Sequence, residues 1–200
     1  LGSRHEDIAE SAANFLASEG EPGELLTRLS SVRDANLRAR LRLGLARRPE
    51  LPVATLLRLL TEPSPQARGD AAWVLGFRAR LDGQDQRASA DVGPTLREAA
   101  TQAQQKHRAR KVAGDSEGEE HELLAWETAL WALRRLVPAS AVDISLGWIG
   151  DSEVPTEIQV QSLLSLGGDH GAPAAVNPVL SRAMAAGDPV LRSLAASAFA

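Results

Sequence analysis

The acidic residues at 114–122 form the densest group of side chains that could do chemistry. The segment reads GDSEGEEHE and carries five carboxylates. A calcium-binding loop needs a glycine at its sixth position and a glutamate at its twelfth, and neither residue falls there. The preceding run KHRARK ends one expected helix with positive charge and the glutamates begin the next, so each run complements the partial charge of its helix end. We interpret both runs as structural and predict no metal site.

The sequence also offers few candidates for a catalytic nucleophile or base. The chain has no cysteine, no phosphate-binding loop and no dinucleotide-binding fingerprint. None of the histidines has the spacing of metal ligands, and we expect all of them to be solvated on the surface: His5, His107, His121 and His170. The sequence therefore predicts a protein that is not an enzyme and that holds no cofactor.

The charge balance disfavours a nucleic-acid partner. The formal net charge is −4, whereas duplex-binding proteins usually carry a basic excess. Arginines gather in NLRARLRLGLARR, where Arg38 and Arg42 share a helix face and Arg40 points elsewhere. That arrangement gives poor support for a ladder of phosphate contacts. We predict that the chain binds no nucleic acid.

Membrane and export signals are not apparent either. No apolar run approaches the roughly 18 residues that span a bilayer. The segment LGSRHEDIAE does not combine a basic region with an apolar core, as a signal peptide does. We expect no membrane association and a cytoplasmic location.

Helix-forming residues dominate the chain, and short clusters of Gly, Pro and Asp interrupt them. Ala, Leu, Arg, Glu and Gln are strong helix formers, and no alternating strand with a hairpin turn occurs. Stop and start signals recur in SEGEPGE, RRPELP, TEPSPQ, GDSEVPTE and AAGDPV. The pattern predicts an all-α fold made of short helices joined by tight turns.

One helical pattern recurs along the chain. Its clearest copies are SPQARGDAAWVLG, from Ser64, and DPVLRSLAASAFA, from Asp188, which place Arg68 over Arg192. Three further copies keep the apolar spacing, at residues 36–46, 123–134 and 155–167. Most copies follow at roughly 30 to 36 residues, a spacing typical of helical arrays. The one wider gap predicts an insertion at about residues 81–118.

These copies resemble the second helix of HEAT repeats, in particular the short bacterial variety related to phycobilin lyase subunits. That helix reads roughly Asp-Pro-x-x-Val-Arg-x-x-Ala-Ala-x-Ala-Leu-Gly. The resemblance covers most of the chain and implies one domain over residues 1–200, an α-solenoid of about five HEAT-like helix pairs with one long insertion. Residues 5–18 would supply the second helix of an incomplete first pair, or a cap.

The resemblance also implies a structural role for the arginine of the pattern. In the family this arginine bonds acidic or carbonyl groups of a neighbouring repeat. The matching residues are Arg38, Arg68 and Arg192. Small residues such as Ala71 and Ala72 would allow helices to approach closely in a stacked array.

A row of large apolar residues occupies a position that the pattern reserves for exposed polar ones. Trp73 lies about 160° around the helix from the buried side of Ala71, because two residues turn a helix by about 200°. Successive copies place at this position Leu43, Trp73, Trp131 and Leu164. Second helices line the concave surface of such solenoids, so we predict an apolar binding row there. For Trp131, packing between repeats is the alternative.

Together these features favour a non-catalytic scaffold or adaptor that binds a protein or peptide partner on its concave surface. Two alternatives remain open. One is an accessory subunit of an enzyme similar to a bilin lyase, or a HEAT-fold DNA glycosylase. The other is a structural arm of a larger multidomain protein.

Overall fold

The computed structural model describes residues 20–29, 31–81, 91–166, 176–185 and 187–199. Every regular element in these ranges is a helix and none is a strand, so the prediction of an all-α fold is confirmed for them. The helix expected at residues 5–18 lies outside the described residues, as do His5 and His170.

The chain divides into two compact units, at 1–132 and 133–200, whereas the sequence repeats predict one continuous domain. The division falls inside helix α7. Unit 1 holds α2 (Pro22–Leu29), α3 (Ala35–Ala46), α4 (Val53–Leu59), α5 (Pro65–Leu81), α6 (Val92–Ala113) and most of α7 (Ser116–Leu136). Unit 2 holds α8 (Pro138–Leu146), α9 (Thr156–Leu166), α10 (Val176–Ala185) and α11 (Pro189–Phe199).

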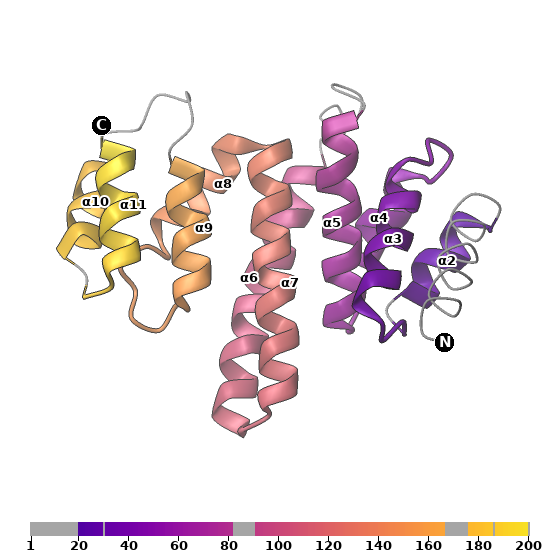
Figure 1. The fold of residues 1–200 in the computed structure, drawn as a ribbon, viewed down its shortest axis with the longest axis horizontal. Coiled ribbons are helices and arrows are strands. Elements are labelled where there is room, and N and C mark those ends of the chain that lie inside the picture. The colour runs from indigo at the N-terminus through magenta and orange to yellow at the C-terminus, as the bar shows by residue number, and fades with distance from the viewer. Residues whose placement is uncertain (1–19, 30, 82–90, 167–175, 186, 200) are drawn as a thin grey trace, which may run out of the picture. The chain divides into compact units, whose positions relative to one another are not determined.

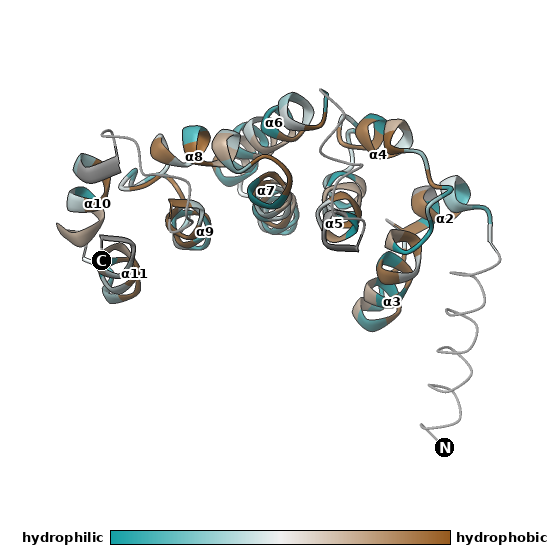
Figure 2. Cartoon of the chain, turned by 90° about the horizontal axis from the view of Figure 1, so that it is seen from above, coloured by the Kyte–Doolittle hydropathy of each residue, from teal (hydrophilic) through white to brown (hydrophobic). Residues whose placement is uncertain are grey.

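Each unit is built from two layers of helices. In unit 1, α3, α5 and α7 form one layer, and α2, α4 and α6 form the other (Figures 1 and 2). Helix α5 packs on α2, α3, α4 and α6, which makes it the central helix of this unit. In unit 2, α9 packs on both α8 and α11, and α10 packs on α11. The helices of the recurring pattern therefore share a layer within each unit.

Local signals set the helix ends. The Asp34 carboxylate accepts a hydrogen bond from the Leu37 amide at 2.8 Å and caps α3. The Asp115 carboxylate does the same for α7, with the Gly118 amide at 3.0 Å. Between α6 and α7 the chain turns at Gly114, whose φ of 71° is a conformation that glycine adopts without strain. Proline opens α5, α8 and α11, where its missing amide proton costs nothing.

The predicted insertion is largely one long helix, α6, which pairs with α7. Helix α6 has 22 residues and α7 has 21, which makes them the longest helices of the described part of the chain. Their far ends project beyond the other helices of unit 1 (Figure 1). Residues 91–118 of the predicted insertion therefore extend a helix pair, and residues 82–90 lie outside the described residues.

Small residues fill the centre of unit 1. Ala71 and Ala72 of α5 are fully buried, as expected for small residues that allow helices to approach closely, and so are Val74 and Leu75. Unit 2 has its own core, composed of Val142, Ile149, Leu163, Leu166, Val179, Leu180, Ala183, Leu191 and Ala195.

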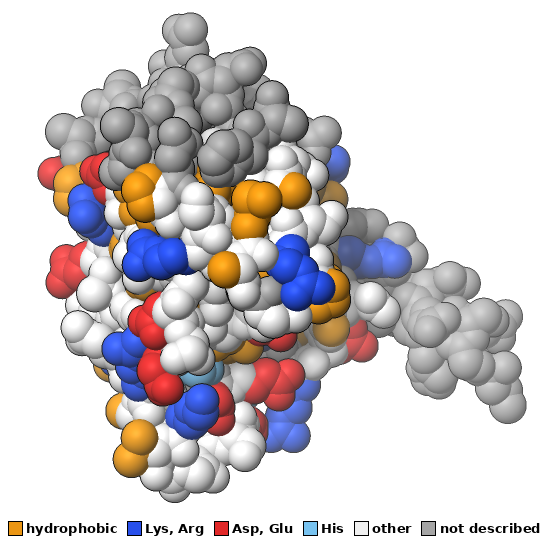
Figure 3. Space-filling view, turned by 90° about the vertical axis from the view of Figure 1, so that its left-hand side faces the viewer, with side chains coloured by type: hydrophobic (Ala, Val, Ile, Leu, Met, Phe, Trp, Pro, Cys, Tyr) orange, Lys and Arg blue, Asp and Glu red, His pale blue; other side chains and the backbone are white. Residues whose placement is uncertain are grey.

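The surface of unit 2 mixes apolar and charged side chains. Figure 3 faces the end formed by α10 and α11, and hydrophobic side chains lie there among charged ones. The large hydrophobic residues exposed on these two helices include Met184 and Val190. No helix in the described ranges is both long and apolar enough to cross a lipid bilayer.

Candidate functional site

Three aromatic side chains meet between α5 and α7, and we call them the aromatic cluster: Trp73, Phe77 and Trp131. The ring centroids of Trp73 and Phe77 lie 4.9 Å apart with the rings 10° from parallel. Those of Trp73 and Trp131 lie 6.3 Å apart at 16°. All three side chains are half-buried. The cluster is thus a stacked set of rings that retains some accessible surface.

A glycine makes room for the cluster. A Cβ atom at Gly76 would lie 2.4 Å from Cζ3 of Trp131 and 3.0 Å from the Cα of Ala132, closer than packed atoms approach. The Trp131 ring therefore rests directly on the backbone of α5. Trp73 and Phe77 belong to the same helix and meet because residues four apart share a face. The sequence analysis missed Phe77, although this spacing could have indicated it.

Within unit 1, the structure brings together two residues of the predicted apolar row. Trp73 and Trp131 stack on each other, and Leu43 is half-buried on α3 in the same layer. Leu164 is 43% exposed on α9 and belongs to unit 2. Whether these residues bind a partner stays a prediction.

Two arginines of α3 share one buried carboxylate on α5. Arg38 donates from Nε to Asp70 Oδ1 at 3.1 Å and from Nη2 to Oδ2 at 2.9 Å. Arg42 forms an ion pair with the same Asp70 Oδ1. Asp70 is completely buried, whereas the two arginines remain slightly exposed. Arg38 and Arg42 do share a face, as their spacing predicts, but the sequence analysis did not identify Asp70 as their partner.

A second ion pair is buried on both sides. The Arg68 guanidinium on α5 contacts the Glu122 carboxylate on α7, and both side chains are almost wholly inaccessible. Arg68 also donates to the backbone carbonyls of Glu62 and Pro63, each at 2.8 Å. These bonds to a carboxylate and to carbonyl groups are of the kind that the repeat pattern implies for its arginine. Glu122, expected only to favour a helix end, is the partner that the sequence analysis missed.

Two further arginines bind backbone carbonyls. Arg78 on α5 is buried and donates to the carbonyl of Leu51 at 2.6 Å. Arg192 is exposed on α11 and donates to the carbonyl of Gly187 at 3.0 Å, in the turn before its own helix.

His107 is not a surface residue, so the expectation of solvated histidines is wrong for it. Only 3% of the residue is exposed, because α6 continues along α7 and buries a stripe at residues 96, 99, 100, 103 and 107. Its Nε2 lies 3.4 Å from the Glu119 carboxylate, and its ring meets that of Trp126 edge-on. Nδ1 has no hydrogen-bond partner within the described residues. Burial lowers the pKa of His107, and the negative charge of Glu119 offsets this only in part.

We expect acid to destabilise unit 1 through His107. The folded pKa lies below the ordinary value of 6.5, so the unfolded chain binds more protons as the pH falls through that value. The free energy of unfolding should therefore decrease from about pH 6.5 downwards, until the folded imidazole is also protonated. Urea titrations of the wild type and His107→Gln at a series of pH values measure this, and the decrease should be smaller in His107→Gln.

The matched control is His121→Gln, a half-buried histidine of α7 in the same hairpin. This variant shows how much the loss of a histidine from the hairpin changes the result by itself. Equal pH dependence in the wild type and His107→Gln would show that His107 is not the group responsible.

The described residues contain no group of three or more His, Asp or Glu side chains placed to hold a metal ion. Buried ion pairs join α3 to α5 and α5 to α7. The arrangement can therefore present a rigid, partly accessible aromatic surface. Comparison with known proteins finds no matching family model, no matching curated protein and no matching solved structure.

Proposed function

We propose that the protein is a non-catalytic scaffold that binds a partner protein or peptide on the layer formed by α3, α5 and α7. In this proposal the chain is an α-solenoid of HEAT-like helix pairs, those helices are the second members of their pairs, and the protein acts in the cytoplasm. The single observation that carries the proposal is the aromatic cluster on this layer. Tryptophan is the residue most favoured at the energetic centres of protein interfaces.

The surface around the cluster supports a binding role. Leu124 on α7 is 48% exposed and lies seven residues before Trp131, on the same face of the helix. Leu43 adds a half-buried apolar side chain on α3. These residues project from helices instead of loops, so little conformational entropy would be lost when a partner binds.

Substitution of the cluster tests the proposal. We expect Trp73→Glu to abolish capture of partner proteins from a lysate of the source cells, with an affinity loss of about 2 kcal/mol or more for a central anchor. Leu43→Glu, at the margin of the same layer, should weaken capture as well. Affinity pull-down followed by mass spectrometry measures the bound proteins, and thermal melting checks that each variant is folded.

The matched control is Val112→Glu, which places the same charge on a side chain of α6 that is 90% exposed. This variant should capture the same proteins as the wild type. If Trp73→Glu and Leu43→Glu stay folded and still capture them, the layer is not the binding surface. If Trp73→Glu unfolds, Leu43→Glu decides the question.

A further inference from the structure

The charges around the aromatic cluster are distributed unevenly. Helix α3 carries three arginines and no acidic residue, and Arg47 and Arg48 follow directly. The only acidic residue of α5 is Asp70, which is completely buried. Helix α3 therefore presents positive charge between the exposed carboxylates of Asp34 and Glu50. Helix α5, whose Arg68 and Arg78 are buried, presents no exposed carboxylate. The whole chain has a net charge of −4.

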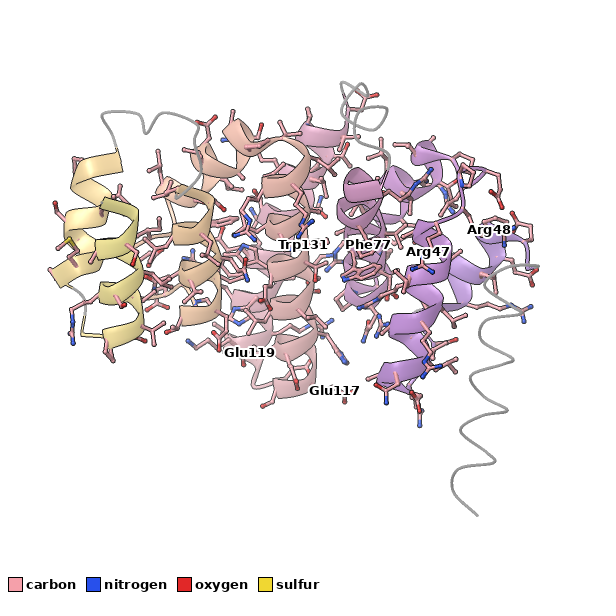
Figure 4. All side chains as sticks on the ribbon, turned by 45° about the horizontal axis from the view of Figure 1, so that its top comes forward. Arg47, Arg48, Phe77, Glu117, Glu119 and Trp131 are labelled. Atoms are coloured by element: carbon pink, nitrogen blue, oxygen red, sulfur yellow. The ribbon has the colours of Figure 1, made fainter. Side chains whose placement is uncertain are left out.

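Two of these arginines are exposed to solvent, Arg40 and Arg47. Arg47, at the end of α3, makes no side-chain hydrogen bond or ion pair with any residue that the structure describes. In Figure 4, Arg47, Phe77 and Trp131 follow one another across α3, α5 and α7. The Arg47 side chain therefore places a positive charge on the α3 side of the aromatic cluster.

Helix α7 carries acidic residues as far as Glu127 and two arginines in its last turn, Arg134 and Arg135. Glu120, Leu124, Glu127 and Trp131 occupy one stripe of this helix, because they are spaced by three or four residues. Glu117 lies farther along α7, at the tip of the hairpin (Figure 4), and Glu119 beside it contacts His107 of α6. The layer is therefore basic at α3, aromatic in the middle and acidic along α7 as far as Glu127.

We infer that this layer binds an acidic peptide segment of a partner protein, with its carboxylates over α3 and an apolar anchor residue on the aromatic cluster. The inference rests on the proposed function and specifies the chemistry of the partner. Arginine binds carboxylates through two parallel hydrogen bonds, and the stacked rings offer apolar area to a leucine or an aromatic side chain. Glu120 and Glu127 of α7 set the direction in which the peptide lies across the layer, because their negative charge repels its acidic half.

A single-stranded nucleic acid fits this layer less well. Its phosphates recur at every nucleotide and would also meet Glu127 and Glu120 on α7. Bases stack on aromatic faces that are open to them, whereas Trp73 is stacked on both Phe77 and Trp131.

Three fluorescent probes test the inference: a synthetic peptide with an acidic half and a leucine anchor, the same peptide with lysines in place of its acids, and oligothymidylate. We expect the acidic peptide to bind more tightly than the other two, and its affinity to fall as salt is added. Arg47→Glu should weaken its binding about tenfold or more. Fluorescence anisotropy measures the affinities, using the full chain.

The matched control is Arg58→Glu on α4, in the opposite layer, where Arg58 pairs with Glu62 at the surface. This variant should bind the acidic peptide as the wild type does. Arg47 and Arg58 are both exposed, so both variants are expected to melt like the wild type.

The other outcomes separate a failure of this inference from a failure of the proposed function. Tighter binding of the lysine peptide overturns the inference about charge but leaves the proposed function in place. Binding of oligothymidylate with the same dependence on Arg47 replaces the peptide with a nucleic acid. If no probe binds while Trp73→Glu still abolishes capture from the lysate, the inference fails and the scaffold proposal stands. If capture is also unaffected, both fail.

Discussion

Glu122→Ala is expected to lower the free energy of unfolding by about 3–5 kcal/mol, the usual cost of removing one partner from a buried ion pair. Arg68 is almost wholly inaccessible and would keep its charge without a carboxylate beside it. Its two bonds to the carbonyls of Glu62 and Pro63 would remain, but carbonyl dipoles do not neutralise a full positive charge. Chemical denaturation followed by circular dichroism measures the loss.

Two further variants identify the cause. Glu24→Ala breaks an ion pair with Arg28 that is exposed on both sides, and we expect a loss of at most about 1 kcal/mol. Replacing both members of the buried pair, as in Arg68→Met with Glu122→Leu, should recover much of the stability, because neither charge remains buried. If Glu122→Ala costs no more than Glu24→Ala, the pair is not desolvated as the structure describes.

Gly76→Ala is expected to destabilise the protein by about 1–3 kcal/mol, although alanine normally stabilises a helix relative to glycine. The added methyl group would overlap the Trp131 ring and press on the backbone at Ala132. The ring cannot move aside without breaking its stack with Trp73. Denaturation curves give the size of the effect, and tryptophan fluorescence should report a change around Trp131.

Gly69 provides a control within the same helix. A methyl group there would meet only the Cα of Ala125, at an ordinary contact distance of 3.6 Å. Gly69→Ala should therefore gain up to about 1 kcal/mol from the higher helix propensity of alanine. Equal stability of the two variants would contradict the close approach of Trp131 to α5.

The sequence predicts the helices well because their signals are local. Pro65 and Pro189 open helices of the recurring pattern, and the small residues Ala71 and Ala72 are buried as their spacing predicts. A stop signal, a start signal and an apolar stripe all act within a few turns of one helix. They can be recognised without knowledge of the rest of the fold.

The partners of the charged residues could not be predicted in this way. Asp70 lies 32 residues from Arg38, and Glu122 lies 54 residues from Arg68. Their meeting depends on how separate helices pack, and a single sequence does not specify that. His107 was misassigned for the same reason, because its burial depends on the length over which α6 and α7 stay in contact.

Asp70 has a consequence for the alignment of α3 along α5. Three of the four leucines of α3 recur every four residues, Leu37, Leu41 and Leu45. Sliding the helix along α5 by one turn would therefore place one of these leucines where another had been. Apolar contact alone distinguishes such a shifted register weakly. Two arginines on one carboxylate distinguish it strongly, since a slide of one turn removes at least one of them from Asp70 and leaves that buried charge less well compensated. The contacts of both arginines with Asp70 therefore select one register of α3 along α5 from several that the leucine contacts would permit.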